Sequence, residues 1–168
     1  MADTKISALT ELTTPADADL LVIIDDPAGT PISKKITRGN LFNATVSMAD
    51  NILDQPVLRD YGETVNAIGS IGGGTQDIDL TLGNVVSGTV DTSTTTFTFS
   101  NPSASGTCCS FTLILTNGGS QTVNWPASVD WAGGTAPTLT TSGVDIPTFL
   151  TTDAGTTWYG FVAGIAMA

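Results

Sequence analysis

Two carboxylates spaced two residues apart are the nearest approach in this sequence to a reactive pair. Asp77 and Asp79 flank Ile78, and side chains two residues apart on a strand share a face. Such a pair could ligate Ca²⁺ together with loop carbonyls, or act as paired catalytic carboxylates. The alternative, which we favour, is two acids on the solvent face of an edge strand, where charge blocks unwanted strand pairing. We therefore predict neither a metal site nor a catalytic residue.

The other residue types that do chemistry are scarce. The chain has no His, which removes the usual imidazole base and the commonest metal ligand. Cys108 and Cys109 are adjacent, so a bridge between them would be strained, and we expect one to pack as a small apolar side chain and the other to lie on the opposite face. The glycine run 72–74 is followed by no Lys, as a phosphate-binding loop would require. These features predict a protein that is not an enzyme and holds no cofactor.

Basic and aromatic side chains are the remaining candidates for binding. Lys34, Lys35 and Arg38 form the one basic cluster of the sequence. They are either a solvated strand face and helix start or an anchor for an acidic surface on a larger particle. The aromatic candidates are Trp125, Trp131, Trp158 and Tyr159. Their rings could contact a glycan, but Trp125 and Trp158 lie in apolar runs, which favours packing in a core or an interface.

Charge is sparse and unevenly distributed. Only 12% of the 168 residues are charged and the net charge is −11, whereas about 25% is usual in soluble domains. Residues 60–168 carry eight carboxylates and no Lys or Arg. This balance argues against nucleic acid as a partner, because binding phosphates needs clustered cations, and no apolar run approaches the ~20 residues of a membrane span. Low charge density favours a surface covered by copies of the chain or by a larger assembly, with a Thr-rich monomeric domain as the alternative.

The N-terminal part predicts a small module and a joint. The apolar run 20–24 and the alternating run 32–36 flank turn residues, which indicates a β-hairpin, and Thr37 is placed to cap a short helix. We assign residues 1–45 to this module. Residues 46–75 are expected to form a joint, with an amphipathic helix within 43–58 and the glycine run at its end.

The remainder of the chain predicts a β domain over residues 76–168. Short runs that alternate at period two are separated by turn residues, the signature of an all-β sandwich. The runs are 78–82, 95–99, 110–115, 122–125, 144–150 and 157–162. The fold class expected for the whole chain is mainly β: a hairpin and helix module followed by an antiparallel, jelly-roll-like β-sandwich, assembled as a trimer.

Two groups of motifs resemble tailed-bacteriophage appendage proteins. The segments Lys5–Leu9, Ala16–Leu21 and Ser33–Thr37 are similar to the short N-terminal module of many such proteins. The segments Phe97–Pro102, Ser110–Leu115, Val123–Pro126 and Thr151–Gly160 are similar to C-terminal β modules of phage tail-fibre and virion-surface proteins. Together these likenesses span about two-thirds of the chain. The sequence departs from long fibres in having no repetitive shaft.

The resemblance implies a homotrimer on the virion surface, made in the host bacterial cytoplasm. The N-terminal module would dock on the major capsid or a tail protein, and the β domain would be exposed. Because no shaft is present, we expect a short appendage for capsid decoration or a head fibre. The alternative is a short tail fibre that binds host-surface glycans, for which the candidate contacts are the aromatic residues above. A carbohydrate-binding module would explain the tryptophans but not the N-terminal motifs. A polysaccharide depolymerase would need paired carboxylates in a cleft and is usually a much longer chain.

Overall fold

A β-hairpin is the described element of the first of two compact units, Met1–Val57 and Leu58–Ala168. The computed structural model describes the backbone of residues 20–25 and 32–37, and residues 54–167 in full. Strand β1 (Leu20–Asp25) pairs antiparallel with β2 (Ile32–Thr37). The predicted hairpin is therefore confirmed.

The helices expected in the N-terminal part fall largely on residues 38–53, which lie outside the described residues. The amphipathic helix is expected to end before Pro56, and the described residues ahead of that proline, 54 and 55, are not helical. Within residues 54–167 the regular structure is strand with three short 3₁₀ turns: η2 (Leu80–Leu82), η3 (Gly118–Ser120) and η4 (Ala132–Gly134). The prediction of a mainly β protein is confirmed for this part of the chain.

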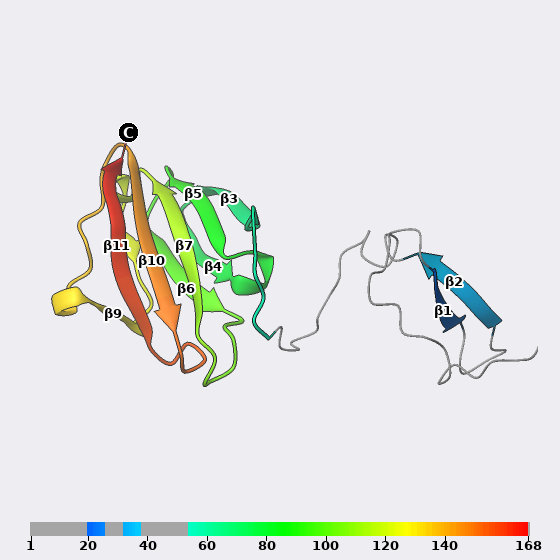
Figure 1. Ribbon diagram of the computed structural model, residues 1–168. Helices are drawn as coiled ribbons and strands as arrows, with labels where there is room; N and C mark the ends of the chain where they lie inside the picture. Colours follow the sequence, from blue (N-terminus) through cyan, green and yellow to red (C-terminus); the bar gives the residue numbers. More distant parts are fainter. Residues whose placement is uncertain (1–19, 26–31, 38–53, 168) are drawn as a thin grey trace, which may run out of the picture. The chain divides into compact units, whose positions relative to one another are not determined.

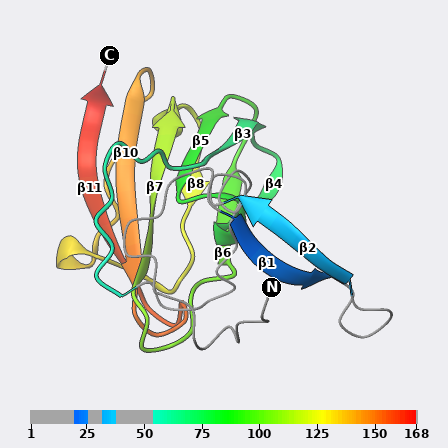
Figure 2. The same ribbon diagram turned by 45° about the vertical axis from the view of Figure 1, so that its right-hand side comes forward.

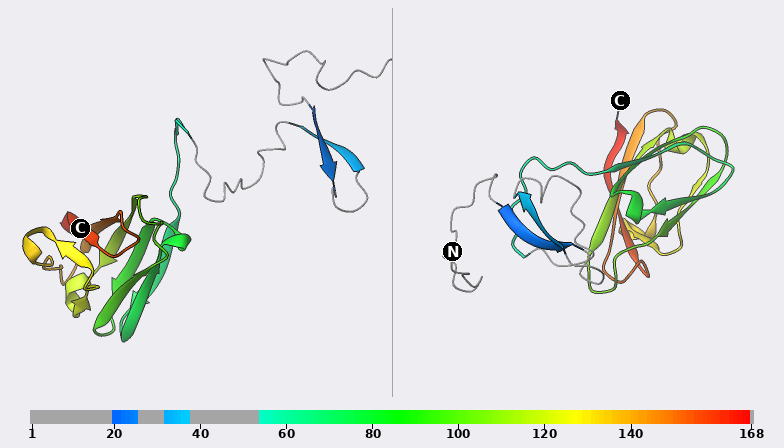
Figure 3. Two further views of the ribbon diagram at one scale, coloured as in Figure 1. Left: turned by 90° about the horizontal axis from the view of Figure 1, so that it is seen from below. Right: turned by 90° about the vertical axis from the view of Figure 1, so that its right-hand side faces the viewer.

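Nine strands of the second unit form two sheets that face each other (Figure 1). Their bounds are β3 (Val65–Ile71), β4 (Gly74–Asp79), β5 (Val85–Val90), β6 (Thr95–Ser100), β7 (Cys109–Thr116), β8 (Val123–Asn124), β9 (Val129–Trp131), β10 (Val144–Thr151) and β11 (Trp158–Met167). The large sheet has the order β3-β5-β7-β10-β11-β9, and the small sheet has the order β4-β6-β8. The two layers are seen along their edges in the right-hand view of Figure 3.

The first six strands alternate between the two sheets. Strands β3, β5 and β7 run parallel to one another in the large sheet, and β4, β6 and β8 run parallel in the small sheet. The registers advance together, since Val65 lies opposite Val85 in one sheet while Gly74 lies opposite Thr95 in the other. The chain thus makes three stacked coils, each with one strand per sheet, as in two-sided β-solenoids.

The expected antiparallel, jelly-roll-like arrangement is wrong for these strands. Parallel neighbours require a long crossover, and here the crossover is a strand of the opposite sheet. Period-two patterning reports which side chains are buried but does not report strand direction, so the sequence could not distinguish the two arrangements. Antiparallel pairing occurs later, where β10 lies between β7 and β11 (Figure 2).

The glycine run is a tight connection inside the β domain. Gly72 and Gly73 join β3 to β4, and a Cβ at Gly72 would lie 2.6 Å from the backbone nitrogen of Ser93. With a φ of +154 at Gly72 and +80 at Gly73, the turn uses backbone conformations that favour glycine. The boundary between the units falls at 57/58, earlier than the expected start of the β domain at 76, because the first coil precedes that residue.

An aromatic cluster fills the space between the sheets. Phe111 and Phe149 stack with centroids 4.8 Å apart, and Phe99 meets both of them edge-on at 4.9 and 5.0 Å. Trp158, 1% exposed, meets Phe99 edge-on at 5.3 Å. Side chains of this size contribute most of the apolar surface buried in a core, so this cluster is the main contact that holds the two sheets together.

Candidate functional site

The carboxylates Asp77 and Asp79 lie on β4, one of the two edge strands of the small sheet. Asp77 is exposed and accepts hydrogen bonds from the hydroxyls of Thr98 (2.7 Å) and Ser100. This placement confirms the favoured interpretation, two acids on an outer edge. Within the described residues, no group of three or more His, Cys, Asp or Glu side chains is arranged to hold a metal ion.

Neutral donors also surround the second carboxylate of this edge. Asp79 accepts from the Asn101 amide at 2.9 Å and from the backbone nitrogen and hydroxyl of Thr81 at 2.9 and 2.7 Å. These bonds, that from Asn101 first, hold the pKa of Asp79 below its usual value. All three bonds reach one oxygen, Oδ1, and through the bond from the Thr81 nitrogen the carboxylate caps η2.

The cysteines divide as expected. Cys108 is exposed, and Cys109 is partly buried against the core. The backbone nitrogen of Ser103 donates to Cys109 Sγ at 3.3 Å. Neither cysteine forms a disulfide.

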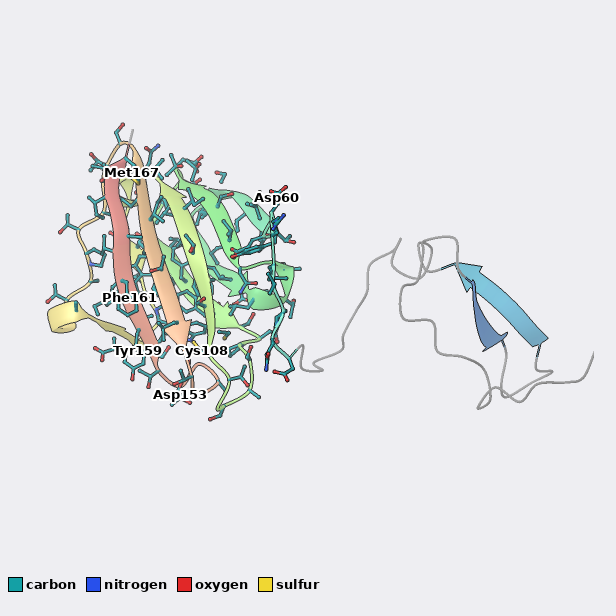
Figure 4. The ribbon with its side chains drawn as sticks, viewed as in Figure 1. Asp60, Cys108, Asp153, Tyr159, Phe161 and Met167 are labelled. Atoms are coloured by element: carbon teal, nitrogen blue, oxygen red, sulfur yellow. The ribbon has the colours of Figure 1, made fainter. Side chains whose placement is uncertain are left out.

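The aromatic candidates are separated by burial. Trp158 and Trp131 belong to the core, with 1% and 8% of their surface exposed. Trp125 is half-buried and stacks on Phe97 at 5.4 Å. Tyr159 is 44% exposed and points outward from β11 (Figure 4). Tyr159 is therefore the most exposed of the four aromatic residues.

The basic candidates are placed in part. Lys34 and Lys35 lie on β2, opposite Ile23 and Val22 of β1. Arg38 lies outside the described residues.

A shallow cavity is lined by Tyr159 together with residues that the sequence analysis did not single out. It has a volume of about 170 Å³ at the end of β9, and its lining residues are Asp130, Trp131, Ala132, Tyr159, Gly160 and Phe161. Asp130 lies opposite Tyr159 in the parallel pair of β9 and β11, and both side chains are exposed. Because side chains alternate along a strand, Phe161 lies on the same face of β11 as Tyr159. Nothing in the sequence indicates Asp130 as a binding residue, because β9 is only three residues long and shows no alternating pattern.

The outer face of the large sheet carries almost no charge. Its six strands hold two carboxylates: Asp145, which is fully buried, and Asp130 on the edge strand β9. The side chains that alternate with the buried ones are hydroxyl or apolar, such as Thr112 and Ile114 of β7 and Thr148 and Leu150 of β10. The small sheet, by contrast, carries Asp77 and Asp79 on its edge strand. The small sheet thus has an acidic edge. We call the outer face of the large sheet the uncharged face, because its one exposed charge is Asp130 at the edge.

A search for known relatives adds nothing to this geometry: no family model, curated protein or solved structure matches the chain. Within the described residues, no helix is long and apolar enough to cross a membrane.

Proposed function

We propose that the protein is a non-enzymatic structural protein of a bacteriophage virion, a short homotrimeric appendage for capsid decoration or a head fibre. Residues 1–45 dock on the particle through a surface that includes Lys34 and Lys35, and the β domain is exposed. The phage assignment rests on the resemblance of the sequence motifs. The trimeric state is implied by the same resemblance, and self-association is supported by the uncharged face of the large sheet.

That face is the structural observation that supports self-association. Residues 60–168 have a formal charge of −8, so identical copies repel one another wherever their carboxylates meet. The outer face of the large sheet is free of charge apart from its Asp130 edge. An uncharged face with exposed aromatic side chains suits contact between subunits, because the cores of interfaces are depleted of charge and enriched in aromatics.

Immunogold labelling of intact particles tests the location. Antibodies raised against the β domain, residues 58–168, are expected to label the capsid. Particles lacking the gene are the control. Labels confined to the tail would favour the short tail fibre, and the absence of label would contradict a virion protein.

The cavity between β9 and β11 favours a second candidate function, glycan binding by a short tail fibre. An exposed aromatic ring beside a carboxylate is suited to a sugar, because the ring packs on the C–H face and the carboxylate accepts from hydroxyl groups. Tyr159 and Asp130 provide these two groups across one strand pair.

If this second function holds, Tyr159→Ala lowers glycan binding at least tenfold, because stacking and apolar burial supply more than the 1.4 kcal/mol that a factor of ten represents. A glycan array with the full chain identifies the sugar, and titration of that sugar measures the loss. Tyr61→Ala is the matched control, since Tyr61 is 66% exposed and does not line the cavity. Equal affinities for the two variants, or no binding by the wild type, would contradict the glycan function.

A further inference from the structure

The second half of β11 is a strand with an open edge. Strand β9 pairs with β11 only at Trp158, Tyr159 and Gly160. From Phe161 to Met167, no other strand of the described residues pairs with that side of β11. We call residues 161–167 the C-terminal arm. An open edge presents backbone N–H and C=O groups that can pair with another chain.

The C-terminal arm is also apolar and exposed on both of its faces. Phe161 and Val162 are neighbours, so they point to opposite sides of the strand, yet 51% and 45% of their surfaces are exposed. Ile165 and Met167 are 42% and 48% exposed. Figure 4 shows Phe161 and Met167 along β11, beyond Tyr159. Natural proteins usually protect such an edge with charge or a covering element, and the arm contains no charged residue.

The arm is nevertheless held in a fixed conformation. Strand β10 pairs with it as far as Val144 opposite Met167. The buried carboxylate of Asp145 accepts a hydrogen bond from the backbone nitrogen of Ala166 at 3.1 Å, where the chain adopts a φ of +54. A surface that is already ordered loses little conformational entropy when it binds. The arm is therefore suited to permanent contact.

We propose that the C-terminal arm binds a second copy of this chain and forms the subunit contact of the homotrimer. This inference rests on the proposed function, which requires self-association. The charge distribution selects a second copy: between two domains of charge −8, contact is least opposed where neither brings a charge. The arm meets that condition on each copy, and in a homotrimer the three arms come together about the threefold axis.

The area around the arm suffices for a stable interface. Six strands at a spacing of about 4.8 Å, with about seven residues each at 3.3 Å, give the large sheet a projected face of roughly 650 Å². The open edge and inner side of the arm add to this area. A standard interface buries about 800 Å² per partner, so the outer face already provides most of that area before the arm is added.

The test replaces apolar side chains of the arm with carboxylates in the full-length chain. Wild type is expected to have a mass of about 52 kDa in size-exclusion chromatography with light scattering, three times the chain mass of 17.2 kDa. Val162→Glu with Ile165→Glu is expected to give a folded monomer of about 17 kDa, because each subunit then brings two carboxylates into an apolar contact. Circular dichroism checks that the variant keeps its β structure.

Leu82→Glu is the matched control. Leu82 is 56% exposed on η2, outside the large sheet, and this variant is expected to remain a trimer. If the arm variant stays assembled, or Leu82→Glu dissociates the trimer instead, the arm is not the contact, although self-association still holds. A monomeric wild type contradicts both the arm contact and the trimer of the proposed function.

Hydrogen exchange supplies a measurement that does not depend on a variant. The backbone amides of residues 161–167 that point to the open edge are expected to exchange slowly in the assembled protein. They should exchange at least tenfold faster after dilution to monomer, while core amides of β7 remain protected. Equal protection of the arm in both states would contradict the proposal.

Discussion

Replacing Asp145 with Asn is expected to destabilise the β domain by about 3 kcal/mol. Asp145 is 0% exposed, and its carboxylate accepts from the Thr140 backbone nitrogen (2.6 Å), the Thr140 hydroxyl (2.7 Å) and the Ala166 backbone nitrogen (3.1 Å). Hydrogen bonds to a charged group contribute about 1.5–3 kcal/mol each. Asn keeps the shape but turns one acceptor into an NH₂ donor, which then faces backbone donors.

Thermal unfolding measures this loss. A change of about 3 kcal/mol lowers the Tm of a domain of this size by on the order of 12 °C. The amide of Ala166 should also exchange faster, because Asp145 is the group that holds it. Asp130→Asn is the control, since Asp130 is an exposed carboxylate on the same sheet. Equal Tm values for the two variants would show that the buried carboxylate contributes no more than a surface charge.

The position of Asp145 links domain stability to the proposed assembly. The same carboxylate ties the loop at Thr140 to β10 and to the C-terminal arm. Losing it frees the arm, so Asp145→Asn is expected to weaken the trimer as well as the fold. The light-scattering measurement above applies without change. A variant with a lowered Tm and an unaltered trimer would separate the two roles.

The strand positions followed from the sequence better than their pairing. The runs 95–99, 110–115 and 144–150 lie within β6, β7 and β10, because alternation records which side chains face the core. Direction depends on where the chain returns. In the first coils, the chain leaves each strand and passes through the other sheet before it comes back beside that strand. No local sequence pattern indicates this path.

Strand β5 was missed for a steric reason. Its inward positions are Val86, Gly88 and Val90. A Cβ at Gly88 would lie 2.3 Å from Cδ1 of Ile71, so the isoleucine of the preceding coil fills the space beneath that glycine. Gly88 occupies a core position without an apolar side chain, whereas the outward-facing Val85 is apolar. Both residues disturb the alternation of apolar and polar side chains by which a strand is recognised. The resulting pattern resembles a loop more than a strand.

The candidate aromatic residues show the same limit. Trp131, Trp158 and Tyr159 have comparable ring chemistry in the sequence, and burial alone separates them. Adjacent positions on β11 fall on opposite faces, so Trp158 enters the core and Tyr159 faces outward. Which face is the core depends on the strand order. The partners of Tyr159 in the cavity, above all Asp130, depend on a parallel pair with β9, which the sequence does not indicate.

Gly160 fixes the position of Trp131 and thereby the wall of this cavity. A Cβ at Gly160 would lie 2.7 Å from the Cε3 and Cζ3 atoms of the Trp131 ring. That ring meets Trp125 edge-on at 5.3 Å and Phe149 at 5.4 Å, so it cannot shift without disturbing the aromatic core. Gly160→Val is therefore expected to cost about 2 kcal/mol, within the range for overpacking a core, and to alter the tryptophan fluorescence.

Gly62→Val is the matched control for this last substitution, because nothing lies within 4 Å of a Cβ at Gly62. Its stability is expected to change by no more than about 0.5 kcal/mol, as is usual for surface positions. Urea unfolding compares the two variants. Equal losses would show that Trp131 does not depend on the glycine beneath it. A selective loss in Gly160→Val, with weaker binding of any sugar that Tyr159 holds, would tie the packing of Trp131 to the shape of the cavity.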